Sequence, residues 1–236
     1  MKIDIGQESS YNVIMNYYIK NVSKEDFRDF FTIYKSDNII QDIISYENDA
    51  PDGNTSGIVL FPDTEEKVIV LIDEKALTNT YIHELTHVYD FYSFAKHFSL
   101  KTNKSIKNHP CYKALNLWSE YHSVSVEIVH NQFIAYHAKN MNFEKRYTFL
   151  QSDIQNMIYG QIICNFPTGK ITYHDIMWLF AGIDICNKYD VSHTYGVPNY
   201  ILKRIPKKYF IIHRLIQNVL DFENLLPILQ DLQSVA

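Results

Sequence analysis

The pattern of apolar and polar positions predicts a mostly helical chain with a short β-rich segment near its first third. Residues 1–50 carry apolar clusters at 11–18, 27–34 and 39–46, which we expect to form mainly amphipathic helices. A Pro- and Gly-containing turn at 49–54 follows. Two runs rich in β-branched residues come next, at 57–61 and 67–72, and the polar segment between them predicts a β-hairpin.

Helical periodicity resumes after the hairpin, where Asp73 can cap the first helix. A polar break at 101–110 ends that helix. The helical segments that we predict from here on are 75–98, 112–139, 143–163, 173–189 and 207–233. A small sheet surrounded by helices is an α+β fold. We expect one domain over residues 1–236, with a possible division into lobes at 1–139 and 140–236.

Composition narrows the classes of partner. The net charge of −5 and a pI near 6.0 argue against nucleic-acid binding, which usually requires a basic surface. No run of 18 apolar residues predicts a membrane span, and residues 1–10 lack the apolar core of a signal peptide. Three widely spaced cysteines without a CxxC pair fit a reducing compartment. We therefore expect a cytoplasmic protein, with leaderless secretion or injection as an effector left open.

The motif that carries chemistry is the run His83-Glu84-Leu85-Thr86-His87, which lies inside the predicted helix 75–98. Residues four apart share one face of a helix, so the two imidazoles can bind one ion. The glutamate that follows the first histidine can take a proton from a zinc-bound water. This is the HExxH signature of zinc metalloproteases.

A catalytic zinc site usually needs a third protein ligand and an open position. Glu120, on the predicted helix 112–139, is our first choice, and Glu127 on the same helix face is the reserve. His122 and His130 are less suitable candidates on that helix. His97 is ten residues beyond His87, which is ~15 Å of helical rise and too far for the same ion.

Supporting roles fall to four further residues. Asp90, one turn after His87, can accept a hydrogen bond from a ligand imidazole and fix its orientation, although it can equally be a surface aspartate. Stabilisation of an oxyanion requires a donor. We expect His193 or Tyr195, from the turn-like segment 192–198, with Tyr121 as another option.

Residues 57–127 resemble the gluzincin arrangement, in which a hairpin, an HExxH helix and a glutamate-bearing helix follow one another. Within that group the chain is similar to ImmA/IrrE-type metallopeptidases, where the hairpin leads directly into the motif helix. It also resembles lethal-factor-type toxin proteases, which share an aspartate three residues after the second histidine, as Asp90 is here, and a ligand helix like that around Glu120-Tyr121. The resemblance implies a zincin-like fold and proteolysis. ImmA/IrrE-type enzymes cleave repressors inside the cell.

The sequence thus predicts a Zn²⁺ metallopeptidase that acts on a protein or peptide substrate, with Glu84 as base and with His83, His87 and Glu120 as ligands. The substrate could add a strand at 57–61 or at 67–72 to the sheet. The alternative is a non-catalytic zinc-binding interaction module on the same scaffold. A weaker alternative makes the two histidines core residues of a helical interaction protein.

Overall fold

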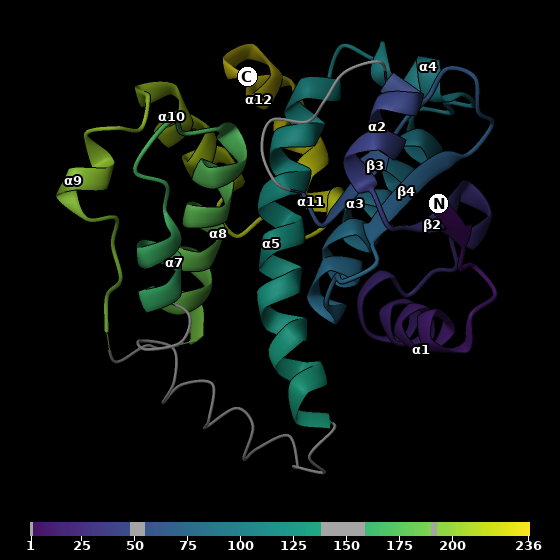
Figure 1. Ribbon diagram of the computed structural model, residues 1–236. Coiled ribbons are helices and arrows are strands. Elements are labelled where there is room, and N and C mark those ends of the chain that lie inside the picture. The colour runs from purple at the N-terminus through teal and green to yellow at the C-terminus, as the bar shows by residue number, and fades with distance from the viewer. Residues whose placement is uncertain (1, 48–54, 138–158, 190–192) are drawn as a thin grey trace. The chain divides into compact units, whose positions relative to one another are not determined.

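The structure is a computed structural model that describes residues 2–47, 55–137, 159–189 and 193–236 (Figure 1). The chain divides into two compact units, Met1–Tyr112 and Lys113–Ala236. It is an α+β protein, as predicted, with many helices and one small mixed sheet. The predicted turn at 49–54 and most of the predicted helix 143–163 lie outside the described residues.

The first unit contains a four-stranded sheet in the order β1-β2-β4-β3. Its strands are β1 (Lys2–Asp4), β2 (Phe31–Ser36), β3 (Gly57–Leu60) and β4 (Val68–Asp73). β3 and β4 are antiparallel, with Gly57 opposite Ile72, so the predicted hairpin is confirmed. β4 lies between β2 and β3, which makes β3 an edge strand and rules out the run 67–72 as the edge.

The prediction that residues 1–50 are mainly helical is wrong for two segments, because β1 and β2 are strands. β2 pairs in parallel with β4, and β1 pairs antiparallel with β2. The apolar cluster at 27–34 is too short for its period to separate helix from strand. This segment is a strand because β4, more than thirty residues further along the chain, supplies its parallel backbone hydrogen bonds.

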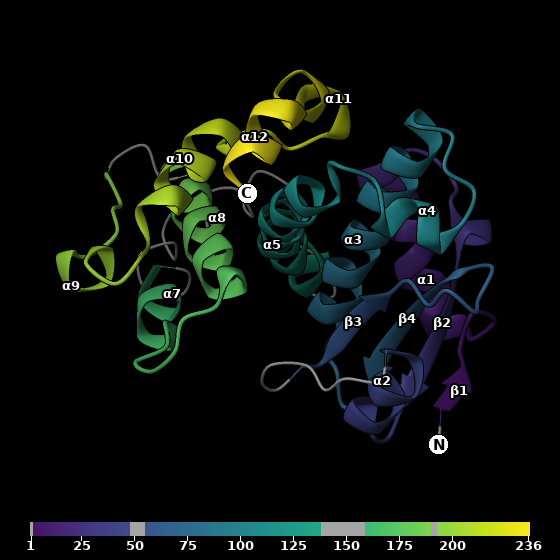
Figure 2. The same ribbon diagram turned by 90° about the horizontal axis from the view of Figure 1, so that it is seen from above.

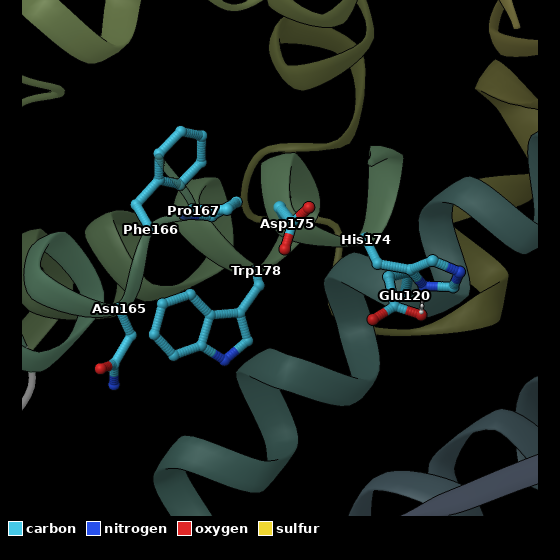
Figure 3. A pocket seen from close by; sticks show the side chains of 7 residues that line it. All are labelled: Glu120, Asn165, Phe166, Pro167, His174, Asp175 and Trp178. Carbon is cyan, nitrogen blue, oxygen red and sulfur yellow. Dashed lines mark ion pairs between the residues drawn. The ribbon is translucent and has the colours of Figure 1, made fainter. Parts of the chain in front are cut away.

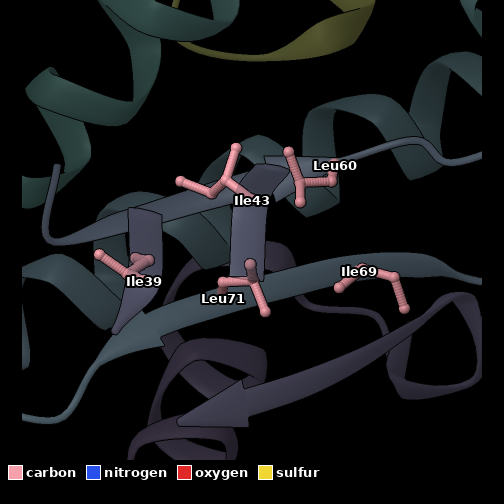
Figure 4. Close-up of a cluster of buried hydrophobic side chains, with 5 residues drawn as sticks. All are labelled: Ile39, Ile43, Leu60, Ile69 and Leu71. Atoms are coloured by element: carbon pink, nitrogen blue, oxygen red, sulfur yellow. The ribbon is translucent and has the colours of Figure 1, made fainter. Parts of the chain in front are cut away.

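Helices cover both faces of this sheet (Figures 1 and 2). α2 (Ile39–Glu47) packs on one face, and α1 (Ser9–Tyr18) and α3 (Thr78–His97) lie on the other. The α2 side has a buried cluster in which two residues of the helix meet three of β3 and β4 (Figure 4): Ile39, Ile43, Leu60, Ile69 and Leu71. Alternate side chains of β4 point to the opposite face, which explains why this strand is apolar and buried from Val68 to Ile72.

α3 begins three residues later than predicted. Asp73 does not cap it; its Oδ1 accepts a hydrogen bond from the backbone N–H of Lys75 at 2.8 Å and closes the turn before the helix. The apolar side chains of α3 that face the core include Ile82 and Leu85, which are fully buried. Tyr89, one turn after Leu85, is only half-buried, and its hydroxyl donates to the Ser23 carbonyl at 3.0 Å.

The remaining short elements of the first unit are η1 (Ile19–Ser23), η2 (Arg28–Phe30) and α4 (Asn103–Lys107). α4 lies in the predicted polar break and holds the hairpin turn. The side-chain amide of Asn103 donates to the carbonyls of Pro62, Glu65 and Lys67 at 3.0–3.1 Å. The loop between β3 and β4 is therefore fixed from the segment that follows α3.

The second unit is helical. Its elements are α5 (Tyr112–His137), α7 (Gly160–Asn165), α8 (Tyr173–Tyr189), α9 (Asn199–Leu202), α10 (Lys207–Ile216), α11 (Phe222–Leu225), η4 (Leu226–Ile228) and α12 (Leu229–Val235). α8 has the predicted bounds. The single helix predicted over 207–233 is broken, because Asn218 is left-handed (φ 65°) and Asp221 caps a new helix at the N–H of Asn224. No helix in the described parts of the chain is long and apolar enough to cross a membrane.

Candidate metal centre

His83 and His87 present their rings from one face of α3, one turn apart. Their Nε2 atoms are 3.1 Å apart and the ring centroids 4.8 Å apart. Two nitrogens bound to a tetrahedral zinc at ~2.0–2.1 Å lie about 3.3 Å from each other. The pair therefore has the separation of two ligands of one ion. A direct hydrogen bond between the rings would have a similar length, so a metal measurement is needed to separate the two states.

The side of α3 near His87 is fixed by α1. The Tyr18 hydroxyl donates to Thr86 Oγ1 at 3.0 Å, and that hydroxyl in turn donates to the Ile82 carbonyl at 2.8 Å. Complete burial raises the pKa of Tyr18 well above its ordinary value, with the charge of Asp90 as a smaller cause. Tyr18 therefore remains a proton donor at neutral pH and holds the turn that carries His83 and His87.

Glu84 is buried, at 5% exposure, against the edge strand β3. Gly57 makes this possible, because a Cβ at that position would lie 2.7 Å from both Cγ and Oε1 of Glu84. The same Cβ would lie 2.8 Å from Cγ2 of Thr80. The proposed base is thus placed by a glycine that the sequence analysis did not single out, although its position at the start of a predicted strand is a recognised signal of close backbone approach.

Among the described residues, one group of His, Cys, Asp and Glu side chains could hold a metal ion, and it consists of His83, His87 and Glu120. Two histidines and a carboxylate are a suitable donor set for a catalytic zinc. Glu120 is the residue that the sequence analysis placed first. It is buried on α5, and its Oε2 is 2.8 Å from Nδ1 of His174 at the beginning of α8.

The other candidates on α5 are not part of this group. Glu127 is half-buried. His122 is buried and stacks on the indole of Trp118, with ring centroids 4.8 Å apart, which is a packing role. The suggestion that Tyr121 stabilises an oxyanion is wrong, because this ring is 1% exposed and its hydroxyl donates to Oδ2 of Asp184 at 2.7 Å.

The remaining predicted residues have clear positions. Asp90 is buried at 1% exposure next to Tyr18, and its role in orienting an imidazole stays a prediction. Tyr195 is buried, and its backbone N–H and carbonyl both bond the side-chain amide of Asn187. Asn187 is thirteen residues after His174, or ~20 Å along α8. Tyr195 is therefore bound near the end of α8, whereas His174, which pairs with Glu120, is at its beginning. The exposed His193 lies near Tyr195.

His174 is the residue near Glu120 that sequence reasoning missed. Its side chain is about half exposed, at 54%, whereas that of Glu120 is 10% exposed. It occupies the first turn of α8, where neighbouring aromatic and acidic residues gave no motif with a recognised spacing. Only the packing of α8 beside α5 identifies it.

Comparison with protein-family models, with curated proteins and with solved structures finds no match. The functional argument therefore rests on the residues themselves.

Proposed function

We propose that this protein is a zinc-dependent metallopeptidase. The observation that carries the proposal is the 3.1 Å separation of the Nε2 atoms of His83 and His87, one helical turn apart and beside a buried glutamate. Glu120 is the proposed third ligand, since it belongs with His83 and His87 to the group that could hold a metal ion. This donor set favours zinc over calcium or magnesium, which prefer all-oxygen sites.

Each residue has a defined task in peptide hydrolysis. When bound, zinc supplies Lewis acidity that polarises the scissile carbonyl and acidifies water. Glu84 accepts a proton from the attacking water and passes it to the leaving amine. Its burial beside Gly57 keeps the carboxylate in one position, which general-base catalysis requires.

The edge strand β3 gives the proposed enzyme a place to hold an extended substrate. β3 forms the edge of the sheet beside β4. It begins with Gly57, which lies against the side chain of Glu84. A peptide that adds a strand to this edge would be bound through main-chain hydrogen bonds, with little dependence on its sequence. The proposed substrate is accordingly an unfolded or extended protein segment.

The decisive experiment is metal analysis combined with a Glu84→Gln variant. Purified protein should contain about one equivalent of zinc and cleave a denatured protein such as casein. Glu84→Gln should keep the zinc and reduce cleavage by at least ~100-fold, because it removes the base and no ligand. Glu127→Gln is the matched control on α5 and should keep both properties.

Three results would contradict the proposal. Cleavage by Glu84→Gln at the parent rate would remove Glu84 as base. Protein that takes up no zinc, even when zinc is added, would identify the 3.1 Å contact as a hydrogen bond between two core histidines. Tight zinc binding, lost in His87→Ala and Glu120→Gln, without any cleavage would instead favour the non-catalytic zinc-binding module.

A further inference from the structure

The second unit contains a cavity of about 270 Å³ beside Glu120 (Figure 3). It lies between α5, the end of α7 and the first two turns of α8. Figure 3 places the indole of Trp178 between Asn165 on one side and the Glu120–His174 pair on the other. Its volume is below that of pockets for drug-sized ligands and suits one amino-acid side chain.

The walls of the cavity are apolar and aromatic. Phe166 is buried at 6% exposure, and Trp178 and Pro167 are half-buried. The loop that carries Phe166 and Pro167 is held from outside by Arg204, whose guanidinium donates to the carbonyls of Pro167 and Gly169 at 2.6 Å. The wall is therefore fixed before any ligand enters.

Asp175 lines the cavity with a carboxylate that can accept a hydrogen bond from a ligand. Its Oδ2 accepts hydrogen bonds from the N–H and the hydroxyl of Thr172, both at 2.7 Å. No described residue donates a hydrogen bond to its Oδ1. The carboxylate of Glu120, by contrast, is already 2.8 Å from Nδ1 of His174. Asp175 is thus the lining carboxylate with an oxygen to offer a ligand.

Charge and shape together select the ligand. The amino end of α8 alone would attract an anion, but Asp175 occupies that end and would repel one. An uncharged aliphatic side chain would take water from Oδ1 without replacing its hydrogen bond. A cation on a long apolar stem satisfies both features, because it can lie over the indole of Trp178 and pair with Asp175.

We propose that this cavity binds an arginine or lysine side chain of the peptide substrate, which makes Asp175 and Trp178 determinants of specificity. This inference rests on the proposed peptidase function. Since Glu120 is both a proposed ligand and part of the cavity wall, the basic residue would occupy one fixed position relative to the scissile bond.

A peptide-library digest and a binding titration test the proposal together. Cleavage products should show arginine or lysine enriched at one position, and Asp175→Asn should reduce that enrichment about fivefold or more while peptides with norleucine there are cleaved as before. Asn keeps an oxygen for the N–H of Thr172. Asp221→Asn is the matched control, because Asp221 also caps a helix of this unit and carries the same charge.

The titration uses the Glu84→Gln protein, so that binding is measured without turnover. Acetyl-arginine amide should change the tryptophan fluorescence, and acetyl-norleucine amide should not; the change is assigned to Trp178 because Trp118, the other tryptophan, is fully buried and does not line the cavity. Asp175→Asn should weaken the arginine response, whereas Asp221→Asn should leave it unchanged.

The outcomes separate this inference from the function on which it rests. Cleavage without any preference for a basic residue, or a preference that survives Asp175→Asn, would overturn the cavity assignment and leave the peptidase standing. Arginine binding that depends on Asp175, in a protein that cleaves nothing, would overturn the peptidase and leave the cavity as a site for basic side chains. Absence of an arginine response in a folded protein would overturn the cavity assignment directly.

Discussion

The absence of a side chain at Gly57 leaves room for Glu84, the proposed base, beside β3. Glu84 fits beside β3 because Gly57 has no Cβ, which would lie only 2.7 Å from Cγ and Oε1 of Glu84. General-base catalysis is sensitive to such placement, since a displacement of ~1 Å in the reacting geometry can cost ~100-fold in rate. At this scale the proposed function depends on a glycine as much as on the acidic residue.

Gly57→Ala is therefore expected to lower kcat by roughly 10–100-fold, because the new methyl group must displace Glu84. Zinc content should not change, since the three atoms nearest the added Cβ belong to Glu84 and Thr80, and neither residue is a proposed ligand. Steady-state cleavage and metal analysis of the purified variant check this. Gly196→Ala is the control, as a Cβ there meets nothing within 4 Å. A Gly57→Ala enzyme with the parent rate would show that Glu84 is not held by this contact.

At the scale of elements, a partly buried polar network joins α5, α8 and α10 around Asp184. Its Oδ2 accepts from the Tyr121 hydroxyl at 2.7 Å and lies 2.8 Å from Nε2 of His213. The His213 ring stacks on Phe180, with centroids 4.2 Å apart. Burial, and then the nearby Asp184, raise the pKa of Tyr121 well above its ordinary value, so its hydroxyl remains a donor. The network fixes α5, the helix that carries Glu120.

Asp184→Ala should destabilise the protein by about 1–3 kcal/mol, because it leaves the buried Tyr121 hydroxyl and the partly buried His213 ring without their acceptor. Urea unfolding followed by circular dichroism measures the change. Asp231→Ala, at an exposed position of α12 in the same unit, should change the free energy of unfolding by less than ~0.5 kcal/mol. Equal stability of the two variants would mean that the network contributes little to the fold.

At the scale of the whole molecule, zinc binding and folding should be linked. A ligand that binds the native state alone stabilises it in proportion to the logarithm of its concentration over Kd. The proposed ligands come from α3 and α5, which are far apart in sequence and cannot form this set in the unfolded chain. Metal removal therefore tests the site without any knowledge of the substrate.

Removal of zinc with a chelator should lower Tm by roughly 5–10 °C, which corresponds to about 2.7 kcal/mol at a hundredfold excess over Kd. The shift should persist in Glu84→Gln and disappear in His87→Ala, because the first retains all ligands and the second lacks one. Differential scanning calorimetry with and without chelator gives the measurement. If neither zinc nor chelator changes the Tm of the parent protein, the proposed metal site is refuted.

The sequence determined those features that depend on local spacing. The HExxH run fixes two imidazoles and a carboxylate on one helix, because residues four apart share a helix face whatever surrounds them. The β3–β4 hairpin, α8 and most of α5 were predictable for the same reason, since their periodicity and turn signals lie within one segment. Glu120 could be chosen as the candidate third ligand because it lies on the next long helix.

Tertiary structure decided everything that depends on partners distant in the chain. β2 is a strand because β4 lies beside it, and Tyr121 is a core residue whose hydroxyl donates a hydrogen bond to Asp184. Gly57 and His174 acquire their roles only through contact with Glu84 and Glu120. The physical reason is that hydrogen bonds and steric contacts between residues tens of positions apart leave no periodic mark on the sequence, whereas helical spacing does.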